Sequence, residues 1–378
     1  MSRFSSEDAG FMARALRLAA RGLYSTRPNP AVGCVLVKDG SVVGEGWHRK
    51  AGEPHAEVVA LQQAGEAAKG ATAYVTLEPC SHYGRTPPCA NALVDAGIAR
   101  VVIASKDPNP EVGGGGIHLL HAHGITVSEG LMQKEAVALN RGFIKAMTEG
   151  MPYVRLKVAT SLDGKIAAAN GESQWITGVV SRQRGHLLRA RHGAIITGVG
   201  TVVADNPSLN VRLPDTMLDR YSLDDALCHP LRVVLDSQLR MSPDAAMLQL
   251  PGQTCVITTA DAAKRAKAMK LEAAGAQVVP VEADMHGRVE LAAALRFLAQ
   301  HHRVRDVLVE AGPTLSGAFL DAGLVDELHW FQAAKVLGDR GRDVFSLPGL
   351  STLAQAKTFQ RVSLCSLGEE IYQVFERS

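Results

Sequence analysis

The sequence predicts an α/β protein built of two domains, and three observations support this prediction. The chain has 378 residues, more than a single hydrophobic core usually organises. Apolar segments of strand length alternate with segments of helical period, as in sheets that are covered by helices. A predicted helix ends at Glu149-Gly150, and Met151-Pro152 begins a second series of strands. We therefore expect one domain over residues 1–150 and another over residues 151–378.

Composition and charge narrow the class of protein. The hydrophobic fraction of 46% and the charged fraction of 21% are those of a soluble globular protein. A net charge of +2 with 5% aromatic residues argues against a nucleic-acid partner, and no apolar run approaches the ~20 residues that cross a membrane. Residues 1–25 lack a signal-peptide core, so we expect a cytoplasmic protein that acts on a small molecule. Four cysteines are expected as free core thiols: Cys34, Cys228, Cys255 and Cys365.

The elements expected in the first domain alternate between helix and strand. Ser5 and Asp8 form a capping box that opens the first helix, and Asp39-Gly40 supplies the positive φ angles of a tight hairpin turn. Such alternation predicts a three-layer domain with a central sheet. The expected helices are 6–22, 55–69, 89–97 and 131–147, and the expected strands are 33–37, 42–47, 72–77 and 100–104.

The second domain repeats this alternation with more strands. Its mixed sheet, flanked by helices, is a shape that commonly holds a nucleotide at the strand ends. The expected strands are 153–159, 194–198, 232–236, 254–258, 277–281, 306–310, 326–334 and 372–375, and the helices are 181–192, 261–274, 288–300 and 314–322.

No G-x-G-x-x-G motif follows a strand of this domain, so a dinucleotide site must be built in another way. The candidate is the segment from Val309 to Ala318, where a strand ends in a glycine turn and a helix begins. Backbone N–H groups at such a turn can bind phosphate. Turns of this kind are equally common in purely structural roles, so both interpretations stay open at this point.

One His and two Cys form the most informative motif of the chain. His55-Ala56-Glu57 is followed by Pro79-Cys80 and by Cys89. Three such ligands can hold Zn²⁺ and leave the fourth position for water, whose pKa the metal lowers to about 7. Glu57 is placed to move protons without binding the metal, as in the zinc-dependent nucleobase deaminases, which carry this order of residues.

The alternative is a closed structural zinc site with Cys34 or His82 as the fourth ligand. That alternative explains neither Glu57 nor the proline before Cys80. His55 and Glu57 are two residues apart and would point to different sides of a regular helix. They are therefore expected at the junction of a loop and a helix, which Pro54 suits.

Longer stretches of the sequence resemble one family, the bifunctional riboflavin-pathway enzymes that join a pyrimidine deaminase to a pyrimidine reductase. The resemblance covers essentially the whole length, although the Gly113–Gly116 run is richer in glycine than the usual loop of the family. The matching segments are 28–34, 44–48, 55–57, 76–89, 107–110, 157–167, 172–177, 188–190, 201–207 and 209–212.

This resemblance implies a cytidine-deaminase-like first domain, a dihydrofolate-reductase-like second domain, Zn²⁺ and NADPH. It implies zinc ligands at His55, Cys80 and Cys89, and Glu57 as the catalytic residue. Implied NADPH contacts are Ala159, Trp175, Thr201, Asp205, Ser237, Gly312, Pro313, Thr314, Leu315, Ser316, Gly317 and Ala318. Implied substrate contacts are Ser173, Arg189, Leu209, Arg212 and Glu310.

The reactions implied are hydrolytic deamination of 2,5-diamino-6-(5-phosphoribosylamino)pyrimidin-4(3H)-one and NADPH reduction of the ribosyl chain of the product. Arg189 and Arg212 suit the 5′-phosphate, since guanidinium binds phosphate bidentately. Asn29 could contact the ribose or simply form a turn, and His48 could face the pyrimidine ring, although a structural role is the expectation. Lys157 could act on the reacting ribose carbon or form an ion pair.

Two other functions compete with this interpretation. One is a deaminase of another nucleotide, or of a tRNA base, whose second half is not a reductase. The other is a zinc-stabilised RNA-binding protein, which the low aromatic content and the balanced charge argue against. The resemblance further implies a homodimer formed through the reductase domain.

Overall fold

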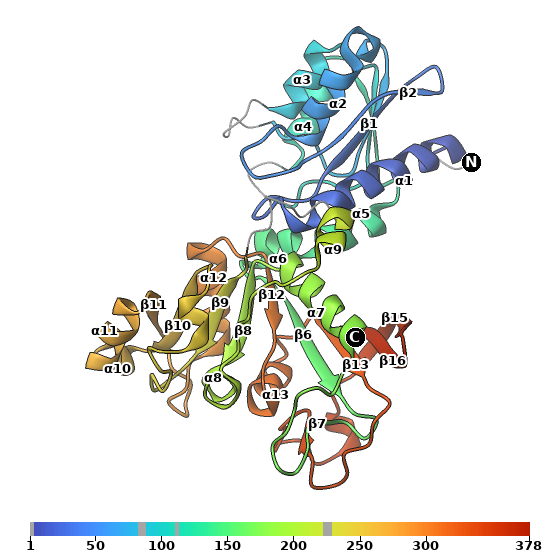
Figure 1. The fold of residues 1–378 in the computed structure, drawn as a ribbon. Coiled ribbons are helices and arrows are strands. Elements are labelled where there is room, and N and C mark those ends of the chain that lie inside the picture. Colours follow the sequence, from blue (N-terminus) through green and yellow to red (C-terminus); the bar gives the residue numbers. More distant parts are fainter. Residues whose placement is uncertain (1–3, 82–87, 110–112, 222–228) are drawn as a thin grey trace. The chain divides into compact units, whose positions relative to one another are not determined.

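The computed structural model describes residues 4–81, 88–109, 113–221 and 229–378 (Figure 1). Its contacts divide the chain into two compact units, each with its own sheet. The first unit is Met1–Gly150 with Asp215–Cys228, and the second is Met151–Pro214 with His229–Ser378. The part of the insertion that is described contains helix α9 (Asp215–Tyr221). The two units are described separately below.

The first unit is organised around a five-stranded sheet of order β2-β1-β3-β4-β5. Strands β1 and β2 form the expected hairpin, and its turn residues Asp39 and Gly40 have φ angles of 50° and 75°. Strand β1 is antiparallel to β3, whereas β3, β4 and β5 run parallel. The strand bounds are β1 (Gly33–Lys38), β2 (Ser41–Trp47), β3 (Thr72–Val75), β4 (Arg100–Ile103) and β5 (Thr126–Glu129). Strand β5 was not among the expected elements.

Helices cover both faces of this sheet, so the three-layer arrangement is confirmed (Figure 1). One face packs against α2, α3 and α4, whose buried side chains include Ala60, Leu93 and Leu120. The other face packs against α1 and α5 through side chains such as Met12 and Ala136. The helix bounds are α1 (Ser6–Arg21), α2 (Ala56–Ala64), α3 (Cys89–Asp95), α4 (Gly115–Ala122), α5 (Gln133–Leu139) and α6 (Arg141–Glu149).

The helix ends of this unit confirm one prediction and correct two. The capping box of Ser5 and Asp8 is present at the start of α1. The helix after His55 ends at Ala64, because Gly65 leaves the helical conformation, and a 3₁₀ turn (Gly65–Ala68) follows. The helix expected over 131–147 is two helices, α5 and α6, which are separated at Asn140. The side chain of Asn140 is engaged with a distant loop, which fixes this break.

The second unit contains a nine-stranded sheet of order β11-β10-β9-β8-β12-β6-β13-β16-β15. The strands from β11 to β13 run parallel, and β16 and β15 complete the sheet in antiparallel fashion. The bounds are β6 (Tyr153–Thr160), β8 (Ala194–Gly198), β9 (Leu231–Leu235), β10 (Thr254–Thr259), β11 (Ala276–Val281), β12 (Asp306–Val309), β13 (Glu327–Gln332), β15 (Phe359–Leu367) and β16 (Glu370–Arg377). A small sheet pairs β7 (Lys165–Ala167) with β14 (Arg342–Asp343).

The strand order contains a switch point, at which the connections that leave two neighbouring strands lead to opposite sides of the sheet. After β8 the chain continues to β9 on one side, whereas after β12 it continues to β13 on the other side. Strands β8 and β12 are neighbours in the sheet. Ligands of open α/β sheets bind at the carboxyl ends of such a strand pair.

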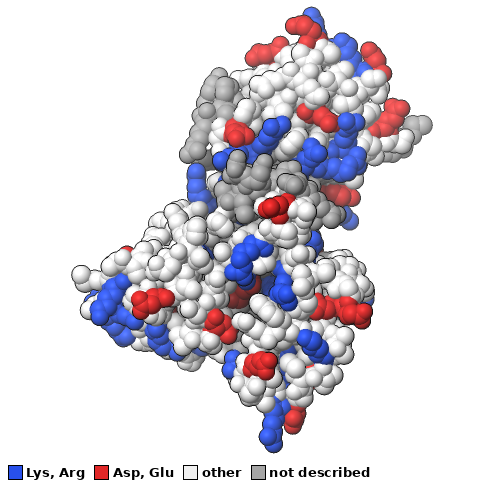
Figure 2. All heavy atoms as spheres, viewed as in Figure 1, with Lys and Arg blue, Asp and Glu red and all other residues white. Residues whose placement is uncertain are grey.

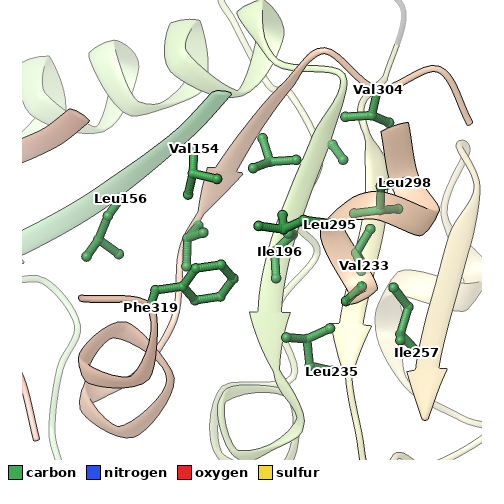
Figure 3. Packing of buried hydrophobic residues seen from close by; sticks show 14 of the residues in the cluster. Val154, Leu156, Ile196, Val233, Leu235, Ile257, Leu295, Leu298, Val304 and Phe319 are labelled. Atoms are coloured by element: carbon green, nitrogen blue, oxygen red, sulfur yellow. The ribbon is translucent and has the colours of Figure 1, made fainter. Parts of the chain in front are cut away.

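Helices pack on both faces of the second sheet as well. Phe319 of α13 and Leu295 and Leu298 of α12 lie on one face against Ile196 and Val233 (Figure 3). The helix bounds are α7 (Val179–Arg191), α8 (Val199–Asp205), α10 (Ala260–Ala263), α11 (Ala266–Ala273), α12 (Leu291–His301) and α13 (Pro313–Asp321). The helix expected over 261–274 is therefore two helices, because Arg265 takes an extended conformation between them.

The cysteines follow the prediction only in part. Cys34 and Cys255 are buried thiols, as expected, and Cys228 lies outside the described residues. Cys365 was expected in the core, and this is wrong because its strand β15 is an exposed edge strand. The apolar neighbours that suggested burial, Val362 and Leu364, are themselves 47% and 55% exposed. No helix among the described residues is long and apolar enough to cross a membrane.

Candidate zinc and nucleotide sites

Three predicted zinc ligands meet at the ends of two helices in the first unit. His55 is the N-cap residue of α2, Cys89 is the first residue of α3, and Cys80 follows β3. The Nδ1 atom of His55 lies 3.0 Å from Sγ of Cys89 and 3.7 Å from Sγ of Cys80. The backbone N–H of Cys89 donates to Sγ of Cys80 at 3.3 Å. The expected position of His55 at a loop–helix junction is thus confirmed.

The donor set fits a zinc ion. Its three donor atoms all lie within 4.8 Å of one another. Zn–S bonds of about 2.3 Å and Zn–N bonds of about 2.0 Å place tetrahedral donors roughly 3.6 Å apart, close to the separations seen here. Among the described residues, these three form the single cluster of this kind, and Cys34 is not part of it. His82, the other alternative fourth ligand, lies outside the described residues.

The side chains of Cys80 and Cys89 share a hydrogen bond, and that of Cys89 is buried. The hydrogen bond with Cys89, together with contacts from His55 and the Cys89 amide, lowers the pKa of Cys80 to about 4. The same pairing and burial raise the pKa of Cys89. Cys80 is therefore the thiolate of the pair, and a divalent cation would take the place of the proton on the other sulfur.

Glu57 lies one residue into α2 and is 3% exposed. Burial, followed by the negative charge of Cys80, raises the pKa of Glu57 to about 7. A carboxyl group with such a pKa can both accept and release a proton near neutral pH. The arrangement therefore combines a three-ligand metal site with a buried acid–base group.

A second carboxylate, Glu78, organises the loops around the ligands, and the sequence had not suggested it. Glu78 is buried, and its two oxygens accept hydrogen bonds of 3.1–3.2 Å from four backbone amides. These amides belong to Asp107, Gly114, Gly116 and Ile117. A Cβ atom on Gly116 would lie 2.0 Å from the carbonyl oxygen of Pro79, so the glycine run permits close packing against the ligand loop.

His48 and Asn29 lie beside the ligands. The Nδ2 atom of Asn29 is 3.1 Å from Nε2 of His48, and Nδ1 of His48 is 3.2 Å from the carbonyl oxygen of Pro54. The ring of His48 meets the ring of His55 edge-on, with centroids 5.1 Å apart. His48 is thus buried with a partner at each ring nitrogen, which agrees with its expected structural role.

In the second unit, three residues predicted to bind substrate, Arg189, Arg212 and Glu310, are linked by hydrogen bonds beside the carboxyl end of β12. Arg189 of α7 donates to both carboxylate oxygens of Glu310, at 2.7 and 2.9 Å. Burial alone would raise the pKa of Glu310, but the charge and hydrogen bonds of Arg189, and then the charge of Lys157, lower it to about 2. Burial lowers the pKa of the half-buried Lys157. Two predicted substrate residues therefore hold each other in place.

Two residues that were not predicted join this cluster. The backbone N–H of Arg212 donates to Nδ1 of His186 at 3.2 Å. Asn210 accepts from Arg189 through its backbone carbonyl and from the Arg212 side chain through Oδ1. Burial, then the charges of Arg189 and Arg212, lower the pKa of His186 to about 4. A histidine three residues before an arginine on a helix was the available signal.

The turns that begin α8 and α13 face the same strand ends. The N–H of Gly312 donates to Oγ1 of Thr201 at 3.2 Å, which ties the two turns together. A Cβ on Gly200 would meet nothing within 4 Å, and one on Gly312 would meet only Thr201 at 3.7 Å. Open space beside two helix N-termini suits a dinucleotide phosphate.

The rest of the 312–318 segment serves packing as well. The buried hydroxyl of Ser316 donates to the carbonyl oxygen of Ala311. A Cβ on Gly317 would lie 2.0 Å from the carbonyl oxygen of Ser346, so α13 is in direct contact with the loop that contains Ser346. Pro313 is the first residue of α13, Leu315 packs beside Gly198, Thr314 is exposed and Ala318 is half-buried.

The remaining predicted cofactor and substrate residues are spread over several segments of the second unit. Trp175 is 61% exposed, with the Arg182 guanidinium 4.5 Å from its ring and the ammonium of Lys335 on its carbonyl oxygen. Leu209 is buried with a φ angle of 45°. Four others are placed by element alone or by backbone contact: Ala159 in β6, Ser173 in the loop before α7, Asp205 at the end of α8, and Ser237 after β9, where its hydroxyl accepts from Val289.

Comparison with known proteins matches both units. Residues 5–105 match the cytidine and deoxycytidylate deaminase zinc-binding region, and residues 152–372 match the RibD C-terminal domain. The riboflavin biosynthesis protein RibD of Escherichia coli is 48% identical over 367 residues, which are 97% of this chain and 98% of that protein. The protein of the same description from Haemophilus influenzae is 46% identical, covering 98% of each chain.

Solved structures agree. RibD of Acinetobacter baumannii superposes with a TM-score of 0.89 at 45% identity, over 98% of this chain and 99% of that chain. A Thermotoga maritima diaminohydroxyphosphoribosylaminopyrimidine deaminase/5-amino-6-(5-phosphoribosylamino)uracil reductase gives 0.85 at 34% identity, over the same shares. Fold and site thus define a two-domain enzyme, a zinc-binding deaminase domain followed by an NADPH-dependent reductase domain.

The chain belongs to the RibD family of riboflavin biosynthesis proteins. The expected fold classes of both domains are thereby confirmed, and the enzyme is bifunctional. A match of the second half to the reductase domain disfavours a deaminase with a non-reductase partner domain.

Proposed function

We propose that the enzyme performs two successive reactions on one pyrimidine ribotide. The first is the hydrolytic deamination of 2,5-diamino-6-(5-phosphoribosylamino)pyrimidin-4(3H)-one. The second is the reduction of the ribosyl chain of 5-amino-6-(5-phosphoribosylamino)uracil to ribityl. The observation that carries this proposal is a complete metal triad with a buried acid–base group on the same chain as the Arg189–Glu310 cluster.

In the deamination, His55, Cys80 and Cys89 would hold the zinc ion. When bound, zinc makes a hydroxide nucleophile available near neutral pH. Glu57 would take the proton of the attacking water and deliver it to the departing amino group, for which a pKa near 7 is suitable. Asn29 would contact the substrate from the loop beside His48. Ammonia then leaves from the ring carbon.

In the reduction, the turn from Gly312 and the residue Thr201 would hold the dinucleotide. NADPH, when bound, supplies the hydride. Further contacts to it are proposed for Ala159, Trp175, Asp205, Ser237, Pro313, Thr314, Leu315, Ser316, Gly317 and Ala318. Arg212, whose side chain is exposed, would bind the 5′-phosphate, and Glu310 the pyrimidine amide edge. Ser173, Leu209 and Arg189 would complete the substrate site.

Mass spectrometry of the diaminopyrimidinone ribotide tests both steps. Incubation with the zinc-loaded enzyme should replace an amino group by oxygen without NADPH. Two further hydrogens should be added only when NADPH is present. Failure of the ribotide to react under either condition would overturn the proposed substrate, and deamination without NADPH-dependent reduction would overturn the second step.

We further propose that two copies of the chain associate through the reductase unit. The outer edge of strand β15 pairs with no other strand among the described residues, and β15 exposes Val362 and Leu364, while Ile371 of β16 is 40% exposed. Such an edge favours pairing with a second copy. Light scattering should give twice the mass of the chain, and Val362→Lys with Leu364→Lys should yield the single mass; a single mass for the unmodified enzyme would contradict the dimer.

The surface charge and the free thiols bear on two further proposals, which concern the partners of the enzyme and its location. The face shown in Figure 2 carries acidic and basic side chains side by side. This supports the proposal that nucleic acid is not a partner. The buried free thiols Cys34 and Cys255 support a cytoplasmic location, where thiols remain reduced.

A further inference from the structure

One buried side chain, Asn140, clamps a loop of the deaminase unit that lies 109 residues away. Its Oδ1 accepts from the backbone N–H of Ala31 at 2.8 Å, and its Nδ2 donates to the carbonyl oxygen of Ala31 at 2.9 Å. Both residues are buried, with exposed fractions of 6% and 3%. The amide group thus satisfies both backbone polar groups of Ala31, as a neighbouring strand would.

The loop needs an external clamp because it can make few hydrogen bonds of its own. Pro28 and Pro30 lack the N–H groups that would tether it. The N–H of Asn29 donates to the carbonyl oxygen of Thr26, and beyond Ala31 the next backbone bond joins Val32 to His48. Between these two bonds, the backbone of Ala31 is held by Asn140 and the side chain of Asn29 contacts His48.

Asn140 is itself rigidly held. It is the residue between α5 and α6, and its backbone N–H and carbonyl bond to Val137 and Ile144 at 3.0 and 2.9 Å. The match to the deaminase zinc-binding region ends at residue 105, so this clamp comes from a segment outside it. The junction of α5 and α6, which lies beyond the matched region, is thereby tied to the loop that carries Asn29.

The clamped loop carries Asn29, which contacts His48, and His48 in turn contacts the candidate zinc ligand His55. Asn29 contacts His48 at 3.1 Å, and the ring of His48 meets that of His55, the histidine ligand, at a centroid distance of 5.1 Å. A displacement of Ala31 would move Asn29 and release one ring nitrogen of His48. Neither change would remove a zinc ligand.

We propose that Asn140 is a positioning residue for the deamination site, which holds Asn29 against the bound ribotide. The inference rests on the proposed deaminase function. Both side-chain hydrogen bonds of Asn140 go to the backbone of Ala31, so Asn140 acts through Ala31. Its loss should therefore weaken substrate binding and orientation while the metal site stays intact.

The test is steady-state kinetics of both activities for Asn140→Ala and Asn140→Asp in the full chain. Asn140→Ala should raise the deaminase KM and lower its kcat/KM by about tenfold to hundredfold, since small misplacements of a contact group have effects of this size. Asn140→Asp keeps the acceptor for the Ala31 N–H but sets its second carboxylate oxygen against the carbonyl oxygen of Ala31, so this variant should also lower the deaminase kcat/KM. Zinc content and reductase activity should equal those of the unmodified enzyme.

A matched control removes an exposed amide from the same segment. Gln133→Ala, at the start of α5, should leave both activities unchanged. Unchanged deaminase kinetics in Asn140→Ala would overturn the inference, and so would a parallel loss of zinc and of both activities, which indicates general unfolding. An unmodified enzyme that does not deaminate the ribotide would overturn the proposed function, a result distinct from either.

A double-mutant cycle tests the route of action. If Asn140 acts through Asn29, the deaminase losses of Asn29→Ala and Asn140→Ala should not add, because the second change finds the contact already gone. Full additivity of the two losses would contradict a common route.

Discussion

The deaminase site and the reductase site differ in how the chain assembles them. The zinc triad comes from three short segments: His55 and Cys89 lie at the starts of two helices, and Cys80 lies in the loop after β3. The reductase cluster brings together Lys157, Arg189 and Glu310, the last two of which are 121 residues apart. At the first site, backbone N–H groups orient the surrounding loops by donating hydrogen bonds to Glu78. At the second site, the charged side chains of Arg189 and Glu310 orient each other.

This difference has a physical cause. A metal ion fixes its own ligands once three donors are near, so the protein needs only to bring the loops together. A site that must bind a charged substrate without a metal keeps its charges in place by pairing them with each other. Replacing one residue should therefore have different effects at the zinc site and at the Arg189–Glu310 pair.

The largest effect is expected from Glu57→Gln. Because the amide cannot accept or return the proton, deaminase kcat should fall by a factor of about 10² to 10⁴. Zinc content, measured by atomic absorption, should not change, whereas His55→Ala should lose the zinc as well. Reductase activity on 5-amino-6-(5-phosphoribosylamino)uracil should be normal in both variants. Retained deamination in Glu57→Gln would exclude it as the acid–base group.

A large effect on the other unit is expected from Glu310→Gln. It leaves the guanidinium of Arg189 without its carboxylate partner in a largely buried place. We expect reductase kcat/KM to fall at least about tenfold and the free energy of unfolding to fall by about 3 kcal/mol. Denaturant unfolding measures the free energy, and the rate of NADPH oxidation measures the reductase kcat/KM. Deamination should be unaffected, and a reductase of normal activity would show that the pair is only structural.

Two glycines offer a matched comparison of packing in the units. Gly116→Ala and Gly317→Ala each place a Cβ atom 2.0 Å from a carbonyl oxygen, of Pro79 and Ser346 respectively. Forced shifts of this kind typically destabilise by about 1–3 kcal/mol. The first variant should bind zinc more weakly and the second should bind NADPH more weakly, as titrations of each ligand will show. Weaker NADPH binding in Gly116→Ala, or weaker zinc binding in Gly317→Ala, would contradict the assignment of these two segments to their ligands.

The smallest effect is a pH dependence of the second unit that depends on His186. Its pKa is lowered from 6.5 to about 4, so the unfolded chain takes up the proton first as the pH falls. The free energy of unfolding should therefore decrease between about pH 6.5 and pH 4, by about 2 kcal/mol for this group after solvent screening of its partly exposed ring reduces the full linkage value of about 3.4 kcal/mol. His186→Asn cannot titrate, and it should remove that part of the decrease in unfolding experiments at pH 7 and pH 4.5. An unchanged pH dependence in the variant would contradict the lowered pKa.

Much of the molecule was predictable because its signals are local. The hairpin at Asp39-Gly40 and the capping box of Ser5 follow from residues within a few positions of one another. The metal triad was predictable because His and Cys at ligand spacing, with an adjacent glutamate, have a specific chemistry. The errors arose where long-range contacts override local pattern, as in the helix interrupted at Asn140 and the exposed Cys365.

The sequence by itself predicted two α/β domains, three candidate zinc ligands and a candidate acid–base residue, since residue type and short spacing specify both secondary structure and donor chemistry. The tertiary structure alone decided that Glu78 collects four amides, that Arg189 pairs with Glu310, and that Asn140 clamps Ala31. Each of these contacts joins groups far apart in the chain. Their partners are mostly backbone amides and carbonyls, which every residue carries, so no pattern of side chains announces them.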